Sequence, residues 1–308
     1  MSDIYQKTFT DNLKFEGIGL HSGKKSKLLI KPAKEDEGIV FERSDLNKNN
    51  LVKANYKNVT SARLCTTLEN DFGVKISTVE HLLAALYLSD IDNAIIEIDS
   101  DEVPIMDGSA KDFLEEFKKA KIKILSKKRK YLKVVDKIEL ADGEKKISIE
   151  PSDKSLEVDF QLDYENKIIG KQNNIIDFGT DDLNDVSSSR TFCLFKDIEE
   201  IKKAGLAKGG SLDNAIVVDD NIILNSGGLR NDKEFVNHKI LDLAGDFLLS
   251  GYRIIGKVVC YQGGHELTNK FLRKLFDNKT SVKVFENKDV VFTENLSLKQ
   301  TSKIAVNA

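Results

Sequence analysis

The strongest constraint on the fold is an order of segments that occurs twice along the chain. In each half, short strands lead to a helix that carries a histidine, and a strand, a glycine turn and another helix follow. His81 precedes Gly108 by 27 residues, and His238 precedes Gly264 by 26. We therefore predict an α+β fold of two domains with similar topology, each a sheet with helices on one face. If the two helical layers face each other, His81 and His238 come together.

Hydrophobic periodicity and turn residues locate the expected elements. Short alternating strands are expected over residues 4–60, and a helix over about 77–89, where Ser77 and Glu80 have the spacing of a capping box. In the first half, a strand is then expected over 93–98 and a helix over 109–120. The second half is expected to contain strands over 131–140, 145–151 and 155–164, a helix over 197–206 between strands 191–195 and 214–218, a helix over 231–250, a strand over 253–262 and a helix over 265–276.

The predicted boundaries follow from this pattern. The first domain covers residues 1–125, and the second covers 126–285, with a small βαβ insertion at about 190–215. A polar tail, expected to be peripheral, covers 286–308. Residues 118–133 are rich in lysine and contain no acidic residue. We interpret this segment as a solvated linker at the domain junction, with weak attraction to an anionic membrane surface or ligand as the alternative.

Composition excludes several classes of function. A chain of 308 residues is long enough to bury a large core, and its net charge of −3 predicts no general affinity for nucleic acid. The first residues lack the apolar centre of a signal peptide, and no apolar run reaches membrane-span length. The three cysteines are far apart with no CxxC spacing, so neither a disulfide framework nor an all-cysteine zinc site is expected. A cytoplasmic location is expected.

The histidines direct attention to metal chemistry. There are only four, and each lies in a segment dense in Glu, Asp, Lys or Gly. His238 and Asp242 are four residues apart on an expected helix, so they share one face, and both are good zinc ligands. Asp246 continues that face. A polar surface stripe is the alternative, although Leu241 and Phe247 supply apolar positions nearby.

The other candidates are weaker individually. Glu80 beside His81 fits a general base next to a metal ligand, but also a capping acid next to a buried imidazole. His265 follows two glycines at a helix start; as a general acid it would need a carboxylate, for which Asp246 is a candidate. Lys239 could hold an anionic group, and the Arg190–Phe192 segment offers a cation and a hydroxyl. Each is also compatible with an ordinary surface role.

Together, these segments resemble the zinc-dependent UDP-3-O-acyl-N-acetylglucosamine deacetylases of bacterial lipid A synthesis. The resemblance covers residues 4–280 approximately and implies two βααβ sandwiches with the active site between them. It rests on eight motifs in order: GIGLHSG, SARLCTTL, STVEHLLAAL, VPIMDGSA, SSSRTFC, KGGSLDNAIVV, NHKILDLAGD and GGHELTNK.

The resemblance implies a role for each matching residue. Glu80 corresponds to the general base, and His265 to the general acid with Asp246 as its charge partner. Zinc would be held, with a water molecule as fourth ligand, by His81, His238 and Asp242. Iron(II) is an alternative to zinc.

The same resemblance suggests how substrate is held. Thr191 corresponds to a hydroxyl that stabilises the oxyanion, and Lys239 to a substrate-binding cation. Phe192 and the insertion correspond to an apolar passage for the fatty acyl chain, and His21 belongs to a substrate-binding motif. In one departure, Thr67 stands where many members carry a second cysteine, which could alter metal affinity.

The implied activity is hydrolysis of the N-acetyl group of UDP-3-O-(3-hydroxyacyl)-N-acetylglucosamine, the committed step of lipid A biosynthesis. The implied setting is the cytoplasm of a Gram-negative bacterium, with no integral membrane segment, and a monomer is the default expectation. Two alternatives stay open: another zinc amidohydrolase, and a catalytically inactive nucleotide-sugar or lipid-binding protein. Chain-length dependence of turnover would separate the first, and absence of bound metal would favour the second.

Overall fold

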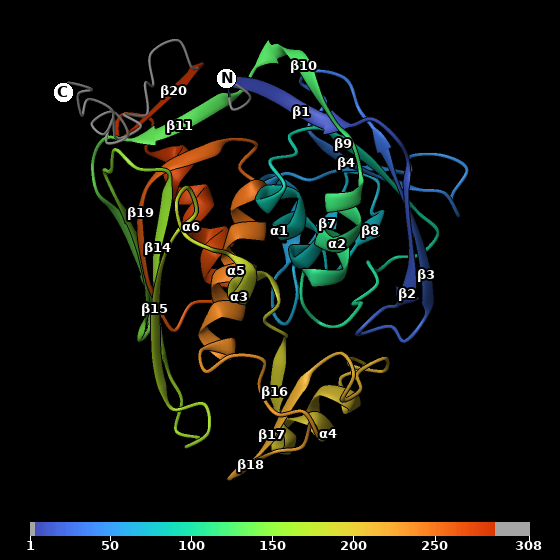
Figure 1. The fold of residues 1–308 in the computed structure, drawn as a ribbon, viewed down its shortest axis with the longest axis vertical. Helices are drawn as coiled ribbons and strands as arrows, with labels where there is room; N and C mark the ends of the chain where they lie inside the picture. The colour runs from blue at the N-terminus through green and yellow to red at the C-terminus, as the bar shows by residue number, and fades with distance from the viewer. Residues whose placement is uncertain (1–3, 287–308) are drawn as a thin grey trace, which may run out of the picture.

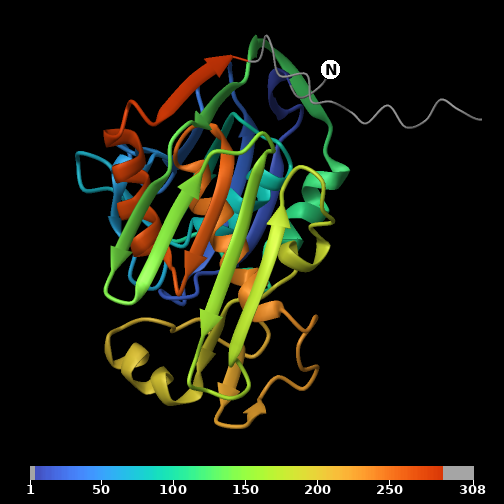
Figure 2. The ribbon, with the colours of Figure 1, turned by 90° about the vertical axis from the view of Figure 1, so that its left-hand side faces the viewer.

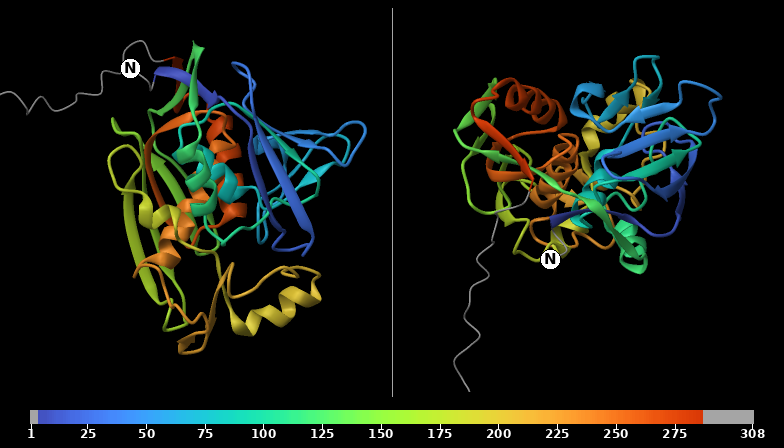
Figure 3. Two further views of the ribbon diagram at one scale, coloured as in Figure 1. Left: turned by 45° about the vertical axis from the view of Figure 1, so that its right-hand side comes forward. Right: turned by 90° about the horizontal axis from the view of Figure 1, so that it is seen from above.

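Two sheets form the outer layers of the molecule and helices fill the space between them. A computed structural model describes residues 4–286. In Figure 1 the strands of one sheet lie on the left and those of the other on the right, with helices between, and the view from above in Figure 3 shows the same layering. The predicted α+β class is confirmed.

The first sheet is built from the N-terminal half. In spatial order its strands are β2 (Leu13–Ile18), β3 (Lys25–Pro32), β9 (Ala94–Ile98), β4 (Ile39–Arg43) and β5 (Leu51–Lys53). Two of its inner strands, β3 and β9, alternate buried with less buried side chains, so one face packs on the helices while the other is nearer to water.

The second sheet is built from the C-terminal half and faces the viewer in Figure 2. Its centre is β19, which pairs with three neighbours. The strands are β12 (Ile138–Asp142), β13 (Lys145–Glu150), β19 (Arg253–Tyr261), β11 (Lys130–Val134), β20 (Val282–Glu286), β14 (Leu156–Asp163) and β15 (Lys171–Asp177).

The two sheets share a local topology. In the first, β9 lies between β3, to which it is antiparallel, and β4, to which it is parallel. In the second, β19 lies antiparallel to β13 and parallel to β14. Each of these central strands follows a long buried helix and precedes another helix. The repeated order in the sequence therefore corresponds to a repeated arrangement in space.

The helices between the sheets carry the site. Nearly every side chain of α1 and α5 is buried, as expected for helices covered on all sides, whereas α2 and α6 bury one face. Their bounds are α1 (Glu80–Leu88), α2 (Lys111–Lys119), α3 (Asn184–Ser187), α5 (Glu234–Leu248) and α6 (His265–Asp277).

A glycine allows α1 and α5 to approach closely. Gly245 lies on α5 against the first turn of α1, where a Cβ atom would overlap the carbonyl oxygen of Glu80. Because both partners are helix backbone, neither can yield as a flexible side chain would. This contact limits the separation of the two helices beside Glu80 and Ala84.

We expect Gly245→Ala to lower the free energy of unfolding by about 1–3 kcal/mol, since overpacking a close helix contact forces backbone shifts. Urea unfolding followed by circular dichroism would measure the change. Gly227→Ala is the matched control, because a Cβ on Gly227 meets no atom within 4 Å. Equal unfolding midpoints for the two variants would contradict the expectation.

Smaller units complete the fold. The insertion lies beyond one end of the two layers, at the bottom of Figure 1, and its parallel pair β16–β17 with the intervening α4 confirms the predicted βαβ unit. It consists of β16 (Phe192–Leu194), α4 (Phe195–Lys203), β17 (Ile216–Asp219) and β18 (Ile222–Ile223). The remaining elements are β1 (Tyr5–Phe9), β10 (Ile122–Lys128), the 3-10 turn η2 (Tyr56–Asn58), β6 (Val59–Ser61), β7 (Thr67–Glu69) and β8 (Lys75–Ile76).

The predicted capping box is wrong. The helix begins at Glu80, and the Ser77 hydroxyl donates to the carbonyl of Asp101 instead of capping it. The Glu80 carboxylate accepts the backbone N–H of Thr66. Ser77 and Glu80 therefore form hydrogen bonds with residues distant in the sequence and not with each other's backbone, as a capping box would require. The structure also shortens the helix predicted over 231–250 to α5, and divides the strand predicted over 131–140 into β11 and β12.

The lysine-rich segment is not an unstructured linker. Residues 122–128 form β10, which pairs antiparallel with β1, and most of its side chains are exposed. Arg129 follows it and is buried, with its guanidinium within 2.8 Å of Asp92 and 3.2 Å of Asp90. The predicted domain limits of 1–125 and 126–285 stay a prediction.

Two further findings concern membrane-spanning helices and the predicted tail. No helix in residues 4–286 is long and apolar enough to cross a membrane. Of the predicted tail, residues 287–308 lie outside the described part of the chain.

Candidate active site and metal centre

Three side chains from the facing helices converge on one point. Nε2 of His81 on α1 lies 3.5 Å from Oδ1 of Asp242 on α5, and Nε2 of His238 lies 3.4 Å from the same oxygen. The donor atoms of all three residues lie within 4.8 Å of one another, and all three side chains are buried. The sequence-predicted pair His238–Asp242 and the histidine of the other half are thus brought together.

The chemistry of this set fits a divalent cation. Oδ1 of Asp242 is buried and has no hydrogen-bond partner among residues 4–286, although two imidazole nitrogens point at it. Burial lowers the pKa of His238 to about 3, which keeps the imidazole neutral as a metal ligand must be. Burial opposes ionisation of Asp242, but His238, Lys239 and His265 outweigh it and hold the pKa of its carboxyl well below the usual range. Two imidazoles and one carboxylate are a common set for zinc, which takes a further ligand in catalytic sites.

A backbone carbonyl orients His238. Nδ1 of His238 lies 3.1 Å from the carbonyl oxygen of Ser189, so Nδ1 carries the proton and Nε2 keeps its lone pair for a cation. Sequence reasoning missed Ser189 because its contribution is a main-chain atom. The motif SSSRTFC marked the segment, but no side-chain signal marked this residue.

Glu80 and His265 flank the three donors. Nε2 of His265 lies 3.9 Å from Oε1 of Glu80 and 3.7 Å from Oδ2 of Asp242. On its other side, Nδ1 of His265 lies 2.7 Å from Oδ2 of Asp246, the carboxylate that the sequence suggested for this purpose. Both Glu80 and His265 are buried.

Thr66 is a second residue that sequence reasoning missed. Its backbone N–H donates to Oε2 of Glu80 at 3.0 Å, and its hydroxyl donates to Oδ1 of Asp246 at 2.7 Å. The residue is 1% exposed. Thr66 therefore binds both Glu80, the candidate base, and Asp246, the partner of the candidate acid His265. Its place in the motif SARLCTTL was the available signal.

The surroundings of Glu80 and His265 shift the pKa of each side chain upward, for different reasons. Burial raises the pKa of Glu80, against the opposing charges of His265 and His81. Burial alone would lower the pKa of His265, but the carboxylates of Asp246, Asp242 and Glu80 prevail and raise it to about 10. One group is thus a stronger base than an exposed carboxylate, and the other keeps its proton.

Aromatic side chains border the polar cluster on the side of the insertion. The Phe192 ring lies 6.2 Å from the His238 ring and 5.0 Å from the Phe235 ring. Nζ of Lys239 lies 5.6 Å from the centre of the Phe192 ring and 2.8 Å from Oδ2 of Asp242. Thr191 precedes Phe192, and its backbone N–H donates to the carbonyl of Gly108. Lys239 and Phe192 therefore lie beside Asp242 and His238, and Thr191 adjoins Phe192 in the chain.

His21 is held in a tight turn beside the insertion. Its backbone N–H donates to the buried carboxylate of Glu102 at 2.8 Å, and its Nδ1 accepts from the Ala207 N–H at 3.4 Å. Burial, with a smaller contribution from His265, lowers the pKa of His21 despite the opposing Glu102. The imidazole is neutral, and its Nε2 has no hydrogen-bond partner in the described part of the chain.

Cys65 and Thr67 lie next to each other near the base candidate. Sγ of Cys65 is 3.8 Å from the hydroxyl of Thr67. Burial raises the pKa of the Cys65 thiol to about 12, and the charge of Glu80 adds to the effect. A protonated thiol is a poor metal ligand, so this pair does not extend the set of three donors.

The fold and this cluster define the class of protein: an α+β enzyme scaffold with a buried His–His–Asp centre between two layered halves, flanked by a carboxylate and an imidazolium. Comparison with known proteins identifies one family. The sequence model of the family UDP-3-O-acyl N-acetylglycosamine deacetylase matches residues 6–277. The chain belongs to this family.

Individual relatives agree over nearly the full length. A protein of Histophilus somni named UDP-3-O-acyl-N-acetylglucosamine deacetylase is 44% identical over 293 residues, which are 94% of this chain and 96% of the relative. The protein of the same name from Pasteurella multocida is 43% identical over 94% of this chain and 96% of the relative. The one from Shewanella frigidimarina is 43% identical over 88% of this chain and 90% of the relative.

Proposed function

We propose that this enzyme hydrolyses the N-acetyl group of UDP-3-O-(3-hydroxyacyl)-N-acetylglucosamine, giving acetate and the free-amine UDP sugar. The observation that carries the proposal is the convergence of Glu80, His265 and the His81–His238–Asp242 set at one buried point, in a member of this family. Amide hydrolysis needs each of these: a base for water, stabilisation of the oxyanion, and an acid for the departing amine.

His81, His238 and Asp242 would hold the metal ion, and zinc is proposed, with iron(II) as the alternative. The bound cation supplies Lewis acidity at the acetyl carbonyl and makes the attacking water more acidic. The neutral form of His238 and the ionised form of Asp242 described above are those that bind a cation without first losing a proton.

Glu80 accepts the proton of the attacking water. Its Oε2 is occupied by the Thr66 N–H, which leaves Oε1 facing His265. Burial raises the pKa of Glu80 and so makes the carboxylate a better base. The hydrogen bond from the Thr66 N–H holds the carboxylate so that no reorientation is needed during the reaction.

His265 donates a proton to the nitrogen of the departing amine. The bond from Nδ1 to Asp246 holds the ring as an imidazolium, with Nε2 directed at the centre. An amine leaves a tetrahedral intermediate poorly without that proton. The Thr191 hydroxyl is proposed to donate to the developing oxyanion, and Lys239 to bind a polar group of the substrate.

Phe192 and its aromatic neighbour Tyr164 are half-buried and offer an apolar surface for the acyl chain beside the insertion, and the buried Phe235 packs against Phe192. His21, whose turn contacts the insertion at Ala207, is proposed to contact the substrate on the same side. A monomer in the cytoplasm, with at most weak contact to a membrane surface, is the proposed setting.

Acetate release from UDP-3-O-(3-hydroxyacyl)-N-acetylglucosamine and from UDP-N-acetylglucosamine would test the substrate assignment. We expect kcat/KM for the acylated substrate to be higher by at least about 100-fold, because burying even a few methylenes contributes about 0.8 kcal/mol each. Equal values for the two substrates would indicate a different amide substrate for the same centre.

A further inference from the structure

A buried ion pair outside the three metal-binding residues holds the segment that orients one of them, His238. Glu234 is the first residue of α5 and is fully buried. Its Oε1 accepts both the backbone N–H and the Nε–H of Arg190, at 3.1 and 2.8 Å. Its Oε2 accepts from Nη2 of Arg190 at 3.2 Å and from the backbone N–H of Arg230 at 2.6 Å.

Arg190 lies in the chain between Ser189, which contacts His238, and Thr191, the proposed oxyanion donor. Ser189 precedes it and presents the carbonyl that accepts a hydrogen bond from Nδ1–H of His238. Thr191 follows it, with its backbone N–H on the carbonyl of Gly108 at 2.8 Å. The Arg190 guanidinium also donates to the carbonyl of Gly228 at 2.8 Å. The hydrogen bonds of Arg190 to Glu234 and Gly228, which we call the Arg190 clamp, therefore fix the main chain on both sides of Arg190.

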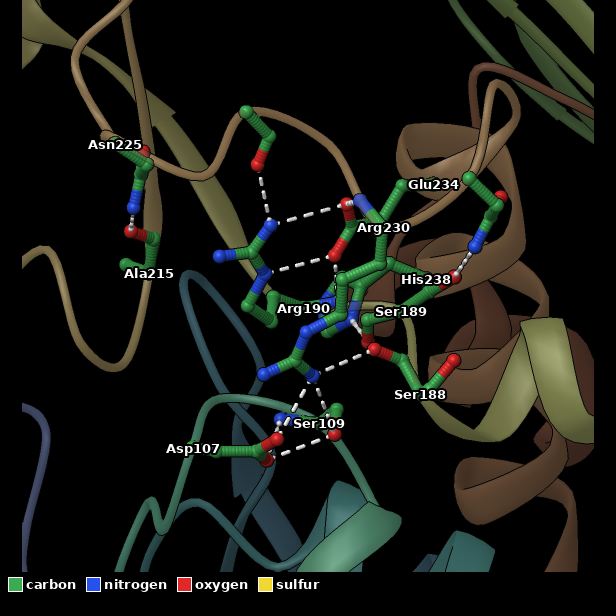
Figure 4. A network of polar contacts seen from close by, with 12 residues as sticks. Asp107, Ser109, Ser188, Ser189, Arg190, Ala215, Asn225, Arg230, Glu234 and His238 are labelled. Atoms are coloured by element: carbon green, nitrogen blue, oxygen red, sulfur yellow. Dashed lines mark hydrogen bonds and ion pairs between the residues drawn. The ribbon is translucent and has the colours of Figure 1, made fainter.

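A second arginine ties this clamp to the other half of the molecule. Nη1 of Arg230 donates to Oδ2 of Asp107 at 2.7 Å and to the carbonyl of Ser188 at 2.8 Å. Oδ1 of Asp107 accepts from both the backbone and the hydroxyl of Ser109. In Figure 4 the two arginines lie between Glu234 and the turn that carries Asp107. The motif VPIMDGSA, to which no chemistry is assigned, thus meets the motif SSSRTFC in one network.

We infer that Glu234 and Arg190 are positioning residues that set both the imidazole of His238 and the main chain of Thr191. A buried ion pair contributes little net stability, because the cost of removing two charges from water offsets their attraction. What this pair does provide is geometry: a planar guanidinium held by two carboxylate oxygens permits little rotation. Groups that orient a metal-binding histidine through its second nitrogen commonly change metal affinity by 10- to 100-fold when removed.

The inference rests on the proposed function for its catalytic part, and on the three donor residues alone for its metal-binding part. Two variants test it. Glu234→Gln keeps the shape and one acceptor oxygen but removes the charge, and Arg190→Lys keeps the charge but removes the planar fork. Arg129→Lys is the matched control, since it alters another buried arginine that binds two carboxylates and contacts no residue of the site.

For each protein, Zn²⁺ affinity would be measured by competition with a chromogenic chelator, kcat and KM by acetate release, and the unfolding midpoint in urea. We expect Glu234→Gln and Arg190→Lys to weaken Zn²⁺ binding by about 10-fold or more. They should lower kcat by about 10-fold with KM nearly unchanged, as expected when a group acts only on the reacting centre. The control should shift the unfolding midpoint and leave the Kd for Zn²⁺ and kcat unchanged.

Zn²⁺ affinity equal to that of the parent in both variants, with only the unfolding midpoint lowered, would overturn the inference and assign the pair to stability alone. If one variant fails to fold, the other decides. Parent protein that binds Zn²⁺ but releases no acetate would refute the proposed function while leaving the affinity comparison intact, so the two failures are distinguishable.

Discussion

Replacing Glu80 with glutamine is expected to lower kcat by about 10³-fold, because the amide keeps the hydrogen bond to the Thr66 N–H but cannot accept a proton from water. Glutamine has nearly the same volume, so the close packing of α1 on α5 is preserved. Metal content and the unfolding midpoint should stay near those of the parent, since Glu80 is not one of the three donors. Acetate release under single-turnover conditions would measure the loss.

The matched control for this variant is Glu115→Gln on α2, whose side chain is 55% exposed. It should turn over as the parent does. Turnover of Glu80→Gln within about 3-fold of the parent would remove Glu80 from the role of base, since general base catalysis contributes about 10²–10⁴-fold.

Replacing His265 with alanine is expected to lower kcat for the amide substrate by about 10²–10³-fold, because the departing amine loses its proton donor. The size of the effect should depend on the leaving group. An analogue with a 2-O-acetyl ester in place of the N-acetyl amide has a leaving group that depends less on protonation, so the variant should be impaired less on it.

Glu80→Gln provides the contrast, since loss of the base should impair amide and ester hydrolysis about equally. The same loss for both substrates in His265→Ala would contradict the assignment of His265 as the acid and would favour a purely electrostatic contribution. Asp246→Asn should reproduce the pattern of His265→Ala more weakly, because the ring loses its charged partner and keeps its position.

The sequence alone predicted those parts of the structure that depend on periodicity. The apolar pattern of the long helices and the spacing of four between His238 and Asp242 are properties of neighbouring residues, and both correspond to α5. The repeated order of segments anticipated that helices from the two halves face each other, which brings the His81 and His238 rings within 5.0 Å.

Other features depended on partners far away in the chain. Ser77 and Glu80 fit a capping box by spacing, yet Asp101 and Thr66 bind them instead. The hydroxyl of Thr66 reaches Asp246, 180 residues away. No local sequence pattern reveals a contact between residues so far apart. The sequence could therefore place Thr66 in a motif but could not identify Asp246 as its partner.

Polar strands were also difficult to predict. The strand β15 has the sequence KQNNIID and was not expected, since few of its residues favour a strand. It forms because its backbone pairs with β14 along seven residues. The lysine-rich β10 pairs with β1 in the same way. In both cases main-chain hydrogen bonds to a distant strand outweigh local propensity.

Metal-dependent turnover by the purified protein tests the central claim most directly. Acetate release would be measured before chelation, after chelation, and after return of Zn²⁺ in steps, for the parent and for His238→Ala. The account predicts that chelation abolishes turnover of the parent, that activity returns and saturates at one metal ion per chain, and that His238→Ala recovers little. Full turnover by thoroughly chelated protein, or recovery of His238→Ala equal to that of the parent, would contradict it.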